Sequence, residues 1–222
     1  MKKNLPIIAL MIIGATSGKI ASAQEVIKKN GYTLSFESNY SALDPELKKR
    51  MISTFFIVYP KLAKEYNKDT DKSVKFVIDT AYKAVAETGG GRVVYSAQYL
   101  KMNPKDIDVV THEVMHIVQG YGNSIGPGWL TEGIADYARY KFGVDNEGGN
   151  WALPEFKATQ KYTDSYRTTA RFLAWIEKQH PGSIKQFDAS LRAHTYTDQS
   201  WVTLTGKNPD ELWKEYTKNP SI

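Results

Sequence analysis

Two histidines in this chain lie at a spacing suited to binding one metal ion. His112 and His116 are four residues apart in the segment H-E-V-M-H, so on a helix they share one face and can hold a single ion. Glu113 lies between them in sequence, one step round the helix, close enough to hold a water molecule bound to that ion. Two of the chain's four histidines fall in this pattern. We therefore expect a catalytic metal site, whereas a chance pattern would leave two ordinary core histidines.

The third ligand is expected from the segment W-L-T-E-G-I-A-D, which follows at short range. An extended zinc motif would need glycine at 119 and histidine at 122, but the chain has Gln119 and Gly122 there. Glu132 is the better candidate, since two histidines, a glutamate and an open position make a catalytic zinc site. Asp136, one helical turn further on, is expected to accept the free ring N–H of a ligand histidine, with His112 as the first choice. The alternative is that both acids are solvated helix carboxylates.

This residue set predicts hydrolysis by a metal-activated water. One Zn²⁺ would lower the pKa of the water that it binds toward ~7, and Glu113 would take the proton as general base. A further donor is needed for the tetrahedral oxyanion, with an expected contribution on the order of 3 kcal/mol. The candidates are Tyr162, Tyr166, His180 and His194. Tyr166 is preferred as a neutral donor at the start of a predicted helix, and the alternative is a half-buried aromatic residue without a catalytic role.

Helices and strands must position these groups. Caps and apolar spacing predict helices over 45–59 (with Pro60 ending or bending the first), 103–119, 129–142, 163–180, 183–193 and 209–217. Alternating apolar residues predict strands over 32–37, 74–79 and 92–100, with a turn at Gly89–Gly91. Residues 24–31 are interpreted as a short mobile lead-in.

The third predicted strand, over 92–100, directly precedes the metal-binding helix. In zinc peptidases such a strand is often a sheet edge, which pairs with an extended substrate through main-chain hydrogen bonds. We therefore expect Val94, Tyr95 and Ser96 to bind substrate. The alternative is an ordinary interior strand with no such role.

The N-terminal segment has the pattern of a secretory signal peptide. Lys2 and Lys3 precede an apolar stretch, Leu5–Gly14, which is too short to span a bilayer, and Ala21–Ala23 form a small-residue cleavage site. We expect residues 1–23 to be removed and a single domain, 24–222, to be exported to the periplasm or out of the cell. The alternative is an N-terminal membrane anchor. No later apolar segment is long enough to span a membrane, so no stable membrane insertion is expected after cleavage.

Charge and cysteine content limit the partners. The precursor has 29 basic and 24 acidic residues, but three of the lysines and none of the acids lie in 1–23. The mature chain therefore has 26 basic and 24 acidic residues, a net charge of only +2. No block of Lys and Arg is interleaved with aromatic residues, so nucleic-acid binding is not expected. Without cysteine there are no disulfides, and stability must come from the core and a bound metal. The expected partner is a peptide or protein substrate.

Four segments carry a resemblance to a known family. They are HEVMHIVQGYGN (112–123), GPGWLTEGIADYARYKFG (126–143), YRTTARFLAW (166–175) and LTGKNPDELWKEY (204–216). They resemble the basic secretory protein family of plants and bacteria, a presumed zinc peptidase group. The resemblance covers nearly the whole mature chain. It implies an α+β, zincin-like single domain, in which a small mixed sheet packs on an active-site helix and a mainly helical C-terminal part follows.

The resemblance also implies roles for individual residues. The metal motif of the family corresponds to His112, Glu113 and His116. The segment W-L-T-E-G is similar to the glutamate-ligand helix of gluzincin peptidases, which implies Glu132 as ligand and Asp136 as its companion. Tyr166 matches a tyrosine that the family carries before its T-A-R-F-L helix.

The function predicted from these residues is that of an exported zinc metallopeptidase with Glu113 as general base. One alternative is a protein- or glycan-binding module that keeps the zincin fold without turnover. The other is a zinc hydrolase that acts on a non-peptide bond of the cell wall. A non-catalytic relative would usually have lost the base or a metal ligand, and none is missing here.

Overall fold

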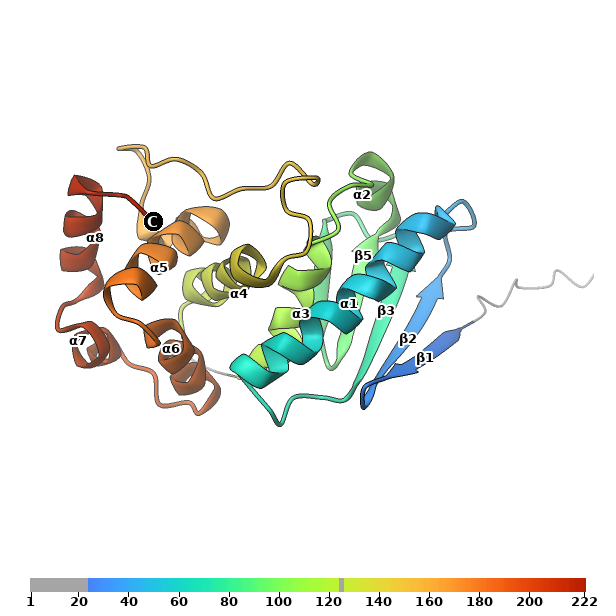
Figure 1. Cartoon of the computed structure of the whole chain (residues 1–222), viewed down its shortest axis with the longest axis horizontal. Coiled ribbons are helices and arrows are strands. Elements are labelled where there is room, and N and C mark those ends of the chain that lie inside the picture. Colours follow the sequence, from blue (N-terminus) through green and yellow to red (C-terminus); the bar gives the residue numbers. More distant parts are fainter. Residues whose placement is uncertain (1–23, 124–125) are drawn as a thin grey trace, which may run out of the picture.

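The structure is a computed structural model that describes residues 24–123 and 126–222. The predicted signal peptide, 1–23, lies outside the described residues. Within them the chain has the predicted α+β fold, with a five-stranded mixed sheet and eight α-helices. The sheet and α1 occupy one end of the molecule and α5–α8 the other, with α3 and α4 between them (Figure 1). None of the described helices is long and apolar enough to cross a bilayer.

The strands are β1 (Glu25–Lys29), β2 (Tyr32–Ser38), β3 (Ser73–Asp79), β4 (Ala86–Gly89) and β5 (Arg92–Ser96). The helices are α1 (Pro45–Glu65), α2 (Ala97–Met102), α3 (Val109–Gln119), α4 (Gly128–Phe142), α5 (Tyr166–Gln179), α6 (Ser183–Arg192), α7 (Gln199–Thr205) and α8 (Pro209–Lys218). A short 3₁₀ turn, η1 (Tyr162–Asp164), precedes α5.

The sheet has the strand order β1-β2-β3-β5-β4. Its two central pairings are parallel and its two outer pairings are antiparallel hairpins. The first hairpin contradicts the expected mobile lead-in: Asn30 and Gly31 both have positive φ, 52° and 80°. That is the backbone of a two-residue type I′ turn, for which Asn-Gly is the favoured sequence. The turn therefore folds residues 24–31 back as an edge strand.

Helix α1 passes through Pro60 without ending, so of the two predicted outcomes, an end or a bend at Pro60, the end is wrong. Its N-terminus is as predicted, with the Asp44 side chain accepting a hydrogen bond from the Glu46 amide at 2.9 Å. Pro60 removes one backbone hydrogen bond and costs about 3 kcal/mol in a helix interior. On either side of it Tyr59 and Leu62 are completely buried. Burying two such side chains contributes roughly 3–6 kcal/mol, which is enough to keep the helix continuous.

The strand β5 and the helix α3 are both shorter than predicted. The strand ends at Ser96, whose side chain caps α2 by accepting a hydrogen bond from the Tyr99 amide at 3.2 Å. Helix α3 begins at Val109 instead of near 103. Its preceding residue, Asp108, is fully buried and accepts hydrogen bonds from the amides of Val144 and Asp145 at 2.8 and 2.6 Å. A long-range contact with the loop after α4 therefore holds the start of α3, the helix that carries the two histidines.

The helices α4, α5, α6 and α8 lie close to their predicted positions. Helices α4 and α5 pack closely at Gly133, where an added Cβ would lie only 2.2 Å from Thr169 Cγ2. This glycine makes room for the side chain of a neighbouring helix directly beside Glu132. The packing of α5 thereby fixes the position of α4 in the molecule.

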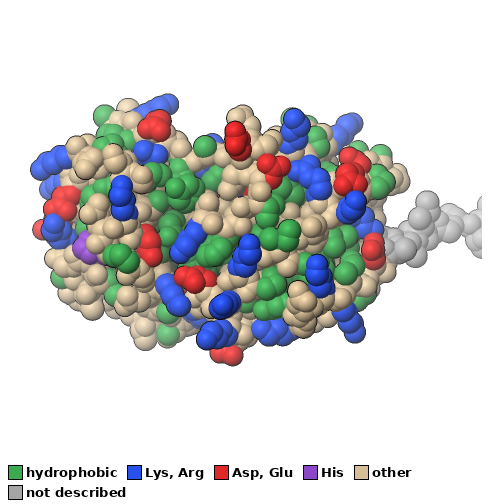
Figure 2. All heavy atoms as spheres, in the orientation of Figure 1, with side chains coloured by type: hydrophobic (Ala, Val, Ile, Leu, Met, Phe, Trp, Pro, Cys, Tyr) green, Lys and Arg blue, Asp and Glu red, His purple; other side chains and the backbone are tan. Residues whose placement is uncertain are grey.

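The outer surface shows no concentration of one charge on the face seen in Figure 2. Lys and Arg side chains are scattered over this face, and Asp and Glu are interspersed among them. Among the described residues several opposite charges form ion pairs, such as Lys48 with Glu25 and Lys75 with Glu37.

Candidate active site

The two histidines of the motif come from one face of α3, and each is held by a hydrogen bond from its Nδ1 side. His112 Nδ1 lies 2.6 Å from Asp136 Oδ1, as predicted for this acid. His116 Nδ1 lies 2.7 Å from Gln119 Oε1, and Gln119 donates onward to the Thr131 carbonyl at 2.9 Å. Both bonds occupy Nδ1, so the Nε2 atoms of the two rings are the ones that face each other and Glu132.

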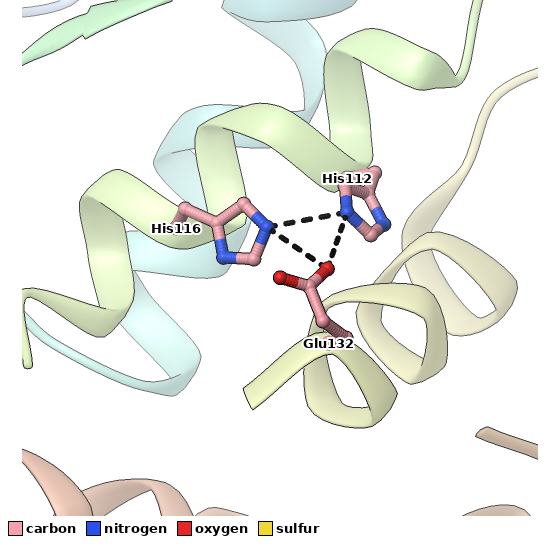
Figure 3. Close-up of side chains that lie close together, drawn as sticks. All are labelled: His112, His116 and Glu132. Carbon is pink, nitrogen blue, oxygen red and sulfur yellow. Dashed lines mark hydrogen bonds and ion pairs between the residues drawn. The ribbon is translucent and has the colours of Figure 1, made fainter. Parts of the chain in front are cut away.

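Glu132 from α4 completes a triangle with the two histidines (Figure 3). Glu132 Oε2 lies 3.3 Å from His112 Nε2 and 3.5 Å from His116 Nε2, and the two Nε2 atoms are 3.2 Å apart. Three ligand atoms bound tetrahedrally to one zinc at about 2.0–2.2 Å would lie roughly 3.3–3.6 Å from each other. The separations and the nitrogen and oxygen donors therefore fit a zinc ion with an open fourth position.

The charges around the triangle favour a cation at its centre. Burial disfavours a charged imidazole, but hydrogen bonds to Asp136 and Glu132 outweigh it and raise the pKa of His112 to about 10. Burial also opposes ionisation of Glu132, yet the hydrogen bonds from His112 and His116 hold the pKa of this carboxyl well below its usual range. The ionised Glu132 carboxylate thus faces both histidines, and a divalent cation at the centre of the triangle would be attracted to the same negative charge.

Glu113 is buried beside the triangle and bonded to the sheet. Only 6% of the residue is exposed. Its Oε2 accepts a hydrogen bond from the hydroxyl of Thr88, on β4, at 2.6 Å. The sequence gives only a weak signal for Gln119, which lies one helical turn after His116. Nothing in the local pattern marks Thr88.

Of the four candidate oxyanion donors, only Tyr166 lies at the site. Its ring stacks on that of His112 with centroids 6.2 Å apart, and more than half of the residue is exposed. Tyr166 and the preceding Ser165 both have positive φ, 49° and 65°, a conformation that costs free energy in residues other than glycine. The charge of Glu132, with partial burial, raises the pKa of Tyr166, so its hydroxyl keeps its proton at neutral pH.

The other three donors point elsewhere or lie away from the cleft. Tyr162 donates its hydroxyl to Asp210 at 2.8 Å. His180 follows the end of α5 and His194 follows the end of α6, and neither residue lines the cleft that holds the histidine pair.

A cleft of about 1380 Å³ runs over the triangle, and β4 forms one of its walls. Ala86, Glu87, Thr88 and Gly89 line this wall. The expectation that the third predicted strand forms the sheet edge is wrong, because β5 pairs with β3 on one side and with β4 on the other. The residues expected to bind substrate, Val94, Tyr95 and Ser96, are at most 3% exposed and do not line the cleft. The second hairpin, turning at Gly90–Gly91, places β4 outside them.

The sequence matches the family described as "Peptidase of plants and bacteria" over residues 23–216. The chain belongs to this peptidase family. The match includes all the residues of the triangle, together with Glu113 and Tyr166. No protein with a curated description matches the sequence.

Solved structures of zinc metallopeptidases share the fold. An M1 zinc metallopeptidase from Deinococcus radiodurans is 13% identical, with a TM-score of 0.52, over 90% of this chain and 51% of its own. A mutant of the enzyme with a Tyr-Ser-Ala substrate bound is 14% identical, with a TM-score of 0.53, over 90% and 52% of the two chains. The chain thus spans about half the length of these structures. At this identity the likeness concerns the fold alone.

Proposed function

We propose that this protein is a zinc-dependent peptidase that uses His112, His116 and Glu132 to hold one zinc ion and Glu113 as general base. The observation that carries the proposal is the triangle of ligand atoms, whose separations fit one tetrahedral ion, beside a buried carboxylate. When bound in such a site, zinc polarises the scissile carbonyl and makes a water molecule acidic. Membership of a peptidase family supports a peptide or protein as the substrate.

Four further side chains have proposed roles in orienting the ligands and in catalysis. Asp136 and Gln119 keep the two ligand histidines in the tautomer that presents Nε2. Glu113 accepts the proton of the attacking water and returns it to the leaving amine. Tyr166, whose hydroxyl stays protonated, donates a hydrogen bond to the developing oxyanion.

The substrate is proposed to bind along β4 in place of β5. A strand with one unpaired edge can accept an extended peptide as an additional strand, and β4 is the outermost strand on this side of the sheet. Its residues line the cleft that contains the ligand triangle. Main-chain pairing of this kind gives affinity with little dependence on the peptide's sequence.

The test uses the purified chain from residue 24 onward, zinc-loaded and then dialysed. It is expected to carry about one zinc per chain and to cleave a mixed peptide library, with products read by mass spectrometry. A chelator should stop cleavage and added zinc should restore it. Protein that cannot be loaded with zinc would overturn the metal site. Zinc-loaded protein that cleaves no peptide would overturn the peptidase and favour a binding module or, if cell-wall fragments are hydrolysed, a non-peptide hydrolase.

The role of Tyr166 predicts a specific kinetic defect. Tyr166→Phe removes only the hydroxyl and should lower kcat by roughly a hundredfold, with KM changed less than about threefold. Zinc content should stay the same, since Tyr166 is not one of the proposed ligands. Tyr162→Phe is the matched control, because its hydroxyl is bonded to Asp210. Equal effects in the two variants would remove Tyr166 from this role.

Export remains part of the proposal, with removal of residues 1–23 by signal peptidase. N-terminal sequencing of the protein recovered from periplasm or medium is expected to start at Gln24. Recovery of the uncleaved chain in the membrane fraction would favour the N-terminal anchor instead.

A further inference from the structure

The hydroxyl of Thr88 makes two contacts with Glu113. It lies 2.6 Å from the carboxylate oxygen Oε2 and 3.2 Å from the backbone carbonyl oxygen of the same residue. A hydroxyl has one hydrogen to donate. The shorter distance assigns that hydrogen to Oε2. The side chain of the proposed base is therefore restrained from the sheet.

The strand that supplies this hydroxyl is also the wall of the cleft. Thr88 lies in the short edge strand β4 between Glu87 and Gly89, both of which are exposed and line the same cleft. Thr88 itself is half-buried, and β4 packs against α3, the helix that carries Glu113. One residue thus connects the surface on which a peptide would bind with the carboxylate that would act on it.

We propose that Thr88 is a positioning residue for Glu113. Its hydroxyl holds one carboxylate oxygen of Glu113 at a fixed place relative to β4, the proposed substrate-binding edge. The inference rests on the proposed peptidase function. A carboxylate has two oxygens, so one can be restrained by Thr88 while the side chain still accepts a proton. Restraint of this kind speeds reaction because a general base must lie within hydrogen-bond reach of the proton that it removes.

The test compares zinc-loaded Thr88→Val, Thr88→Ser and wild type. Valine keeps the branched shape and the strand preference of threonine but has no hydroxyl, whereas serine keeps the hydroxyl. Thr88→Val is expected to lower kcat by about tenfold or more, with KM within about twofold and zinc still at about one per chain. Thr88→Ser should stay within about threefold of wild-type kcat. Thr33→Val, in β2 of the same sheet, is the control for loss of a half-buried strand threonine.

A melting experiment tests the contact without using activity. Thr88→Val is expected to lower the melting temperature of the zinc-loaded protein by about 3 °C or more. In a Glu113→Ala background the same substitution should lower it by clearly less, because the carboxylate acceptor is gone and only the more distant backbone carbonyl, at 3.2 Å, remains. Equal shifts in both backgrounds would overturn the contact.

The two kinds of failure are distinguishable. If the wild type cleaves peptides, any one of three results would overturn the positioning role. They are a wild-type kcat in Thr88→Val, a defect of Thr88→Val confined to KM, and a Thr88→Ser enzyme as slow as the valine variant. If zinc-loaded wild type cleaves nothing, the proposed function fails and the positioning role falls with it. The melting experiment then still decides whether Thr88 and Glu113 interact.

Discussion

Glu113→Gln is expected to reduce peptide hydrolysis by at least about a hundredfold while the protein still holds one zinc per chain. The amide has the size of the carboxylate and can still accept the hydrogen of Thr88, so the local packing should persist. It cannot take a proton from water at neutral pH, and this is the one property that the mechanism requires of residue 113. Initial rates on a peptide identified from the library, together with metal analysis of the same samples, measure both quantities.

Glu147→Gln is the matched control for this variant, because Glu147 is an exposed glutamate outside the triangle. It should leave hydrolysis and zinc content unchanged. If Glu113→Gln retains near wild-type rates, another group accepts the proton and the assignment of Glu113 is wrong. If the variant also loses its zinc, the effect would lie in the metal site and the role as base would have no support.

Glu132→Ala is expected to weaken zinc binding by at least about a hundredfold. The residue supplies the only carboxylate oxygen of the triangle, and without it two imidazoles would hold the ion alone. Zinc at a thousand times its dissociation constant stabilises a folded protein by about 4 kcal/mol, which corresponds to roughly 8–16 °C in melting temperature for a chain of this size. At the same zinc concentration a hundredfold weaker site would contribute only about 1.4 kcal/mol, so the difference in melting temperature between zinc-loaded and chelator-treated protein should fall to about a third or less in this variant.

Zinc-buffered titrations and thermal melts measure this effect. Glu87→Ala provides the comparison, because Glu87 lines the same cleft but does not belong to the triangle. It should keep the zinc-dependent increase in melting temperature. Wild-type zinc affinity in Glu132→Ala would mean that a different group completes the ligand set.

The pairing of β4 with β5 illustrates why the cleft wall was not predictable. Alternation of apolar residues marks β5 as a strand, but strand order depends on which distant segments pair with it. The hairpin at Gly90–Gly91 adds β4 outside β5, and β4 has only four residues, A-E-T-G, without a strong strand pattern. Similarly, Pro60 would break an isolated helix, and only burial of its neighbours keeps α1 continuous.

The features that depend on local helical geometry could be derived from the residues alone. The four-residue spacings of His112 with His116 and of Glu132 with Asp136 place each pair on one face of a helix, wherever that helix lies. The features that depend on contacts between elements become visible only in the folded chain. The close packing of α4 with its neighbours brings Glu132 Oε2 within 3.5 Å of both histidines. The pairing of β4 next to α3 brings Thr88 to Glu113, since side chains distant in sequence meet only where the packed elements place them.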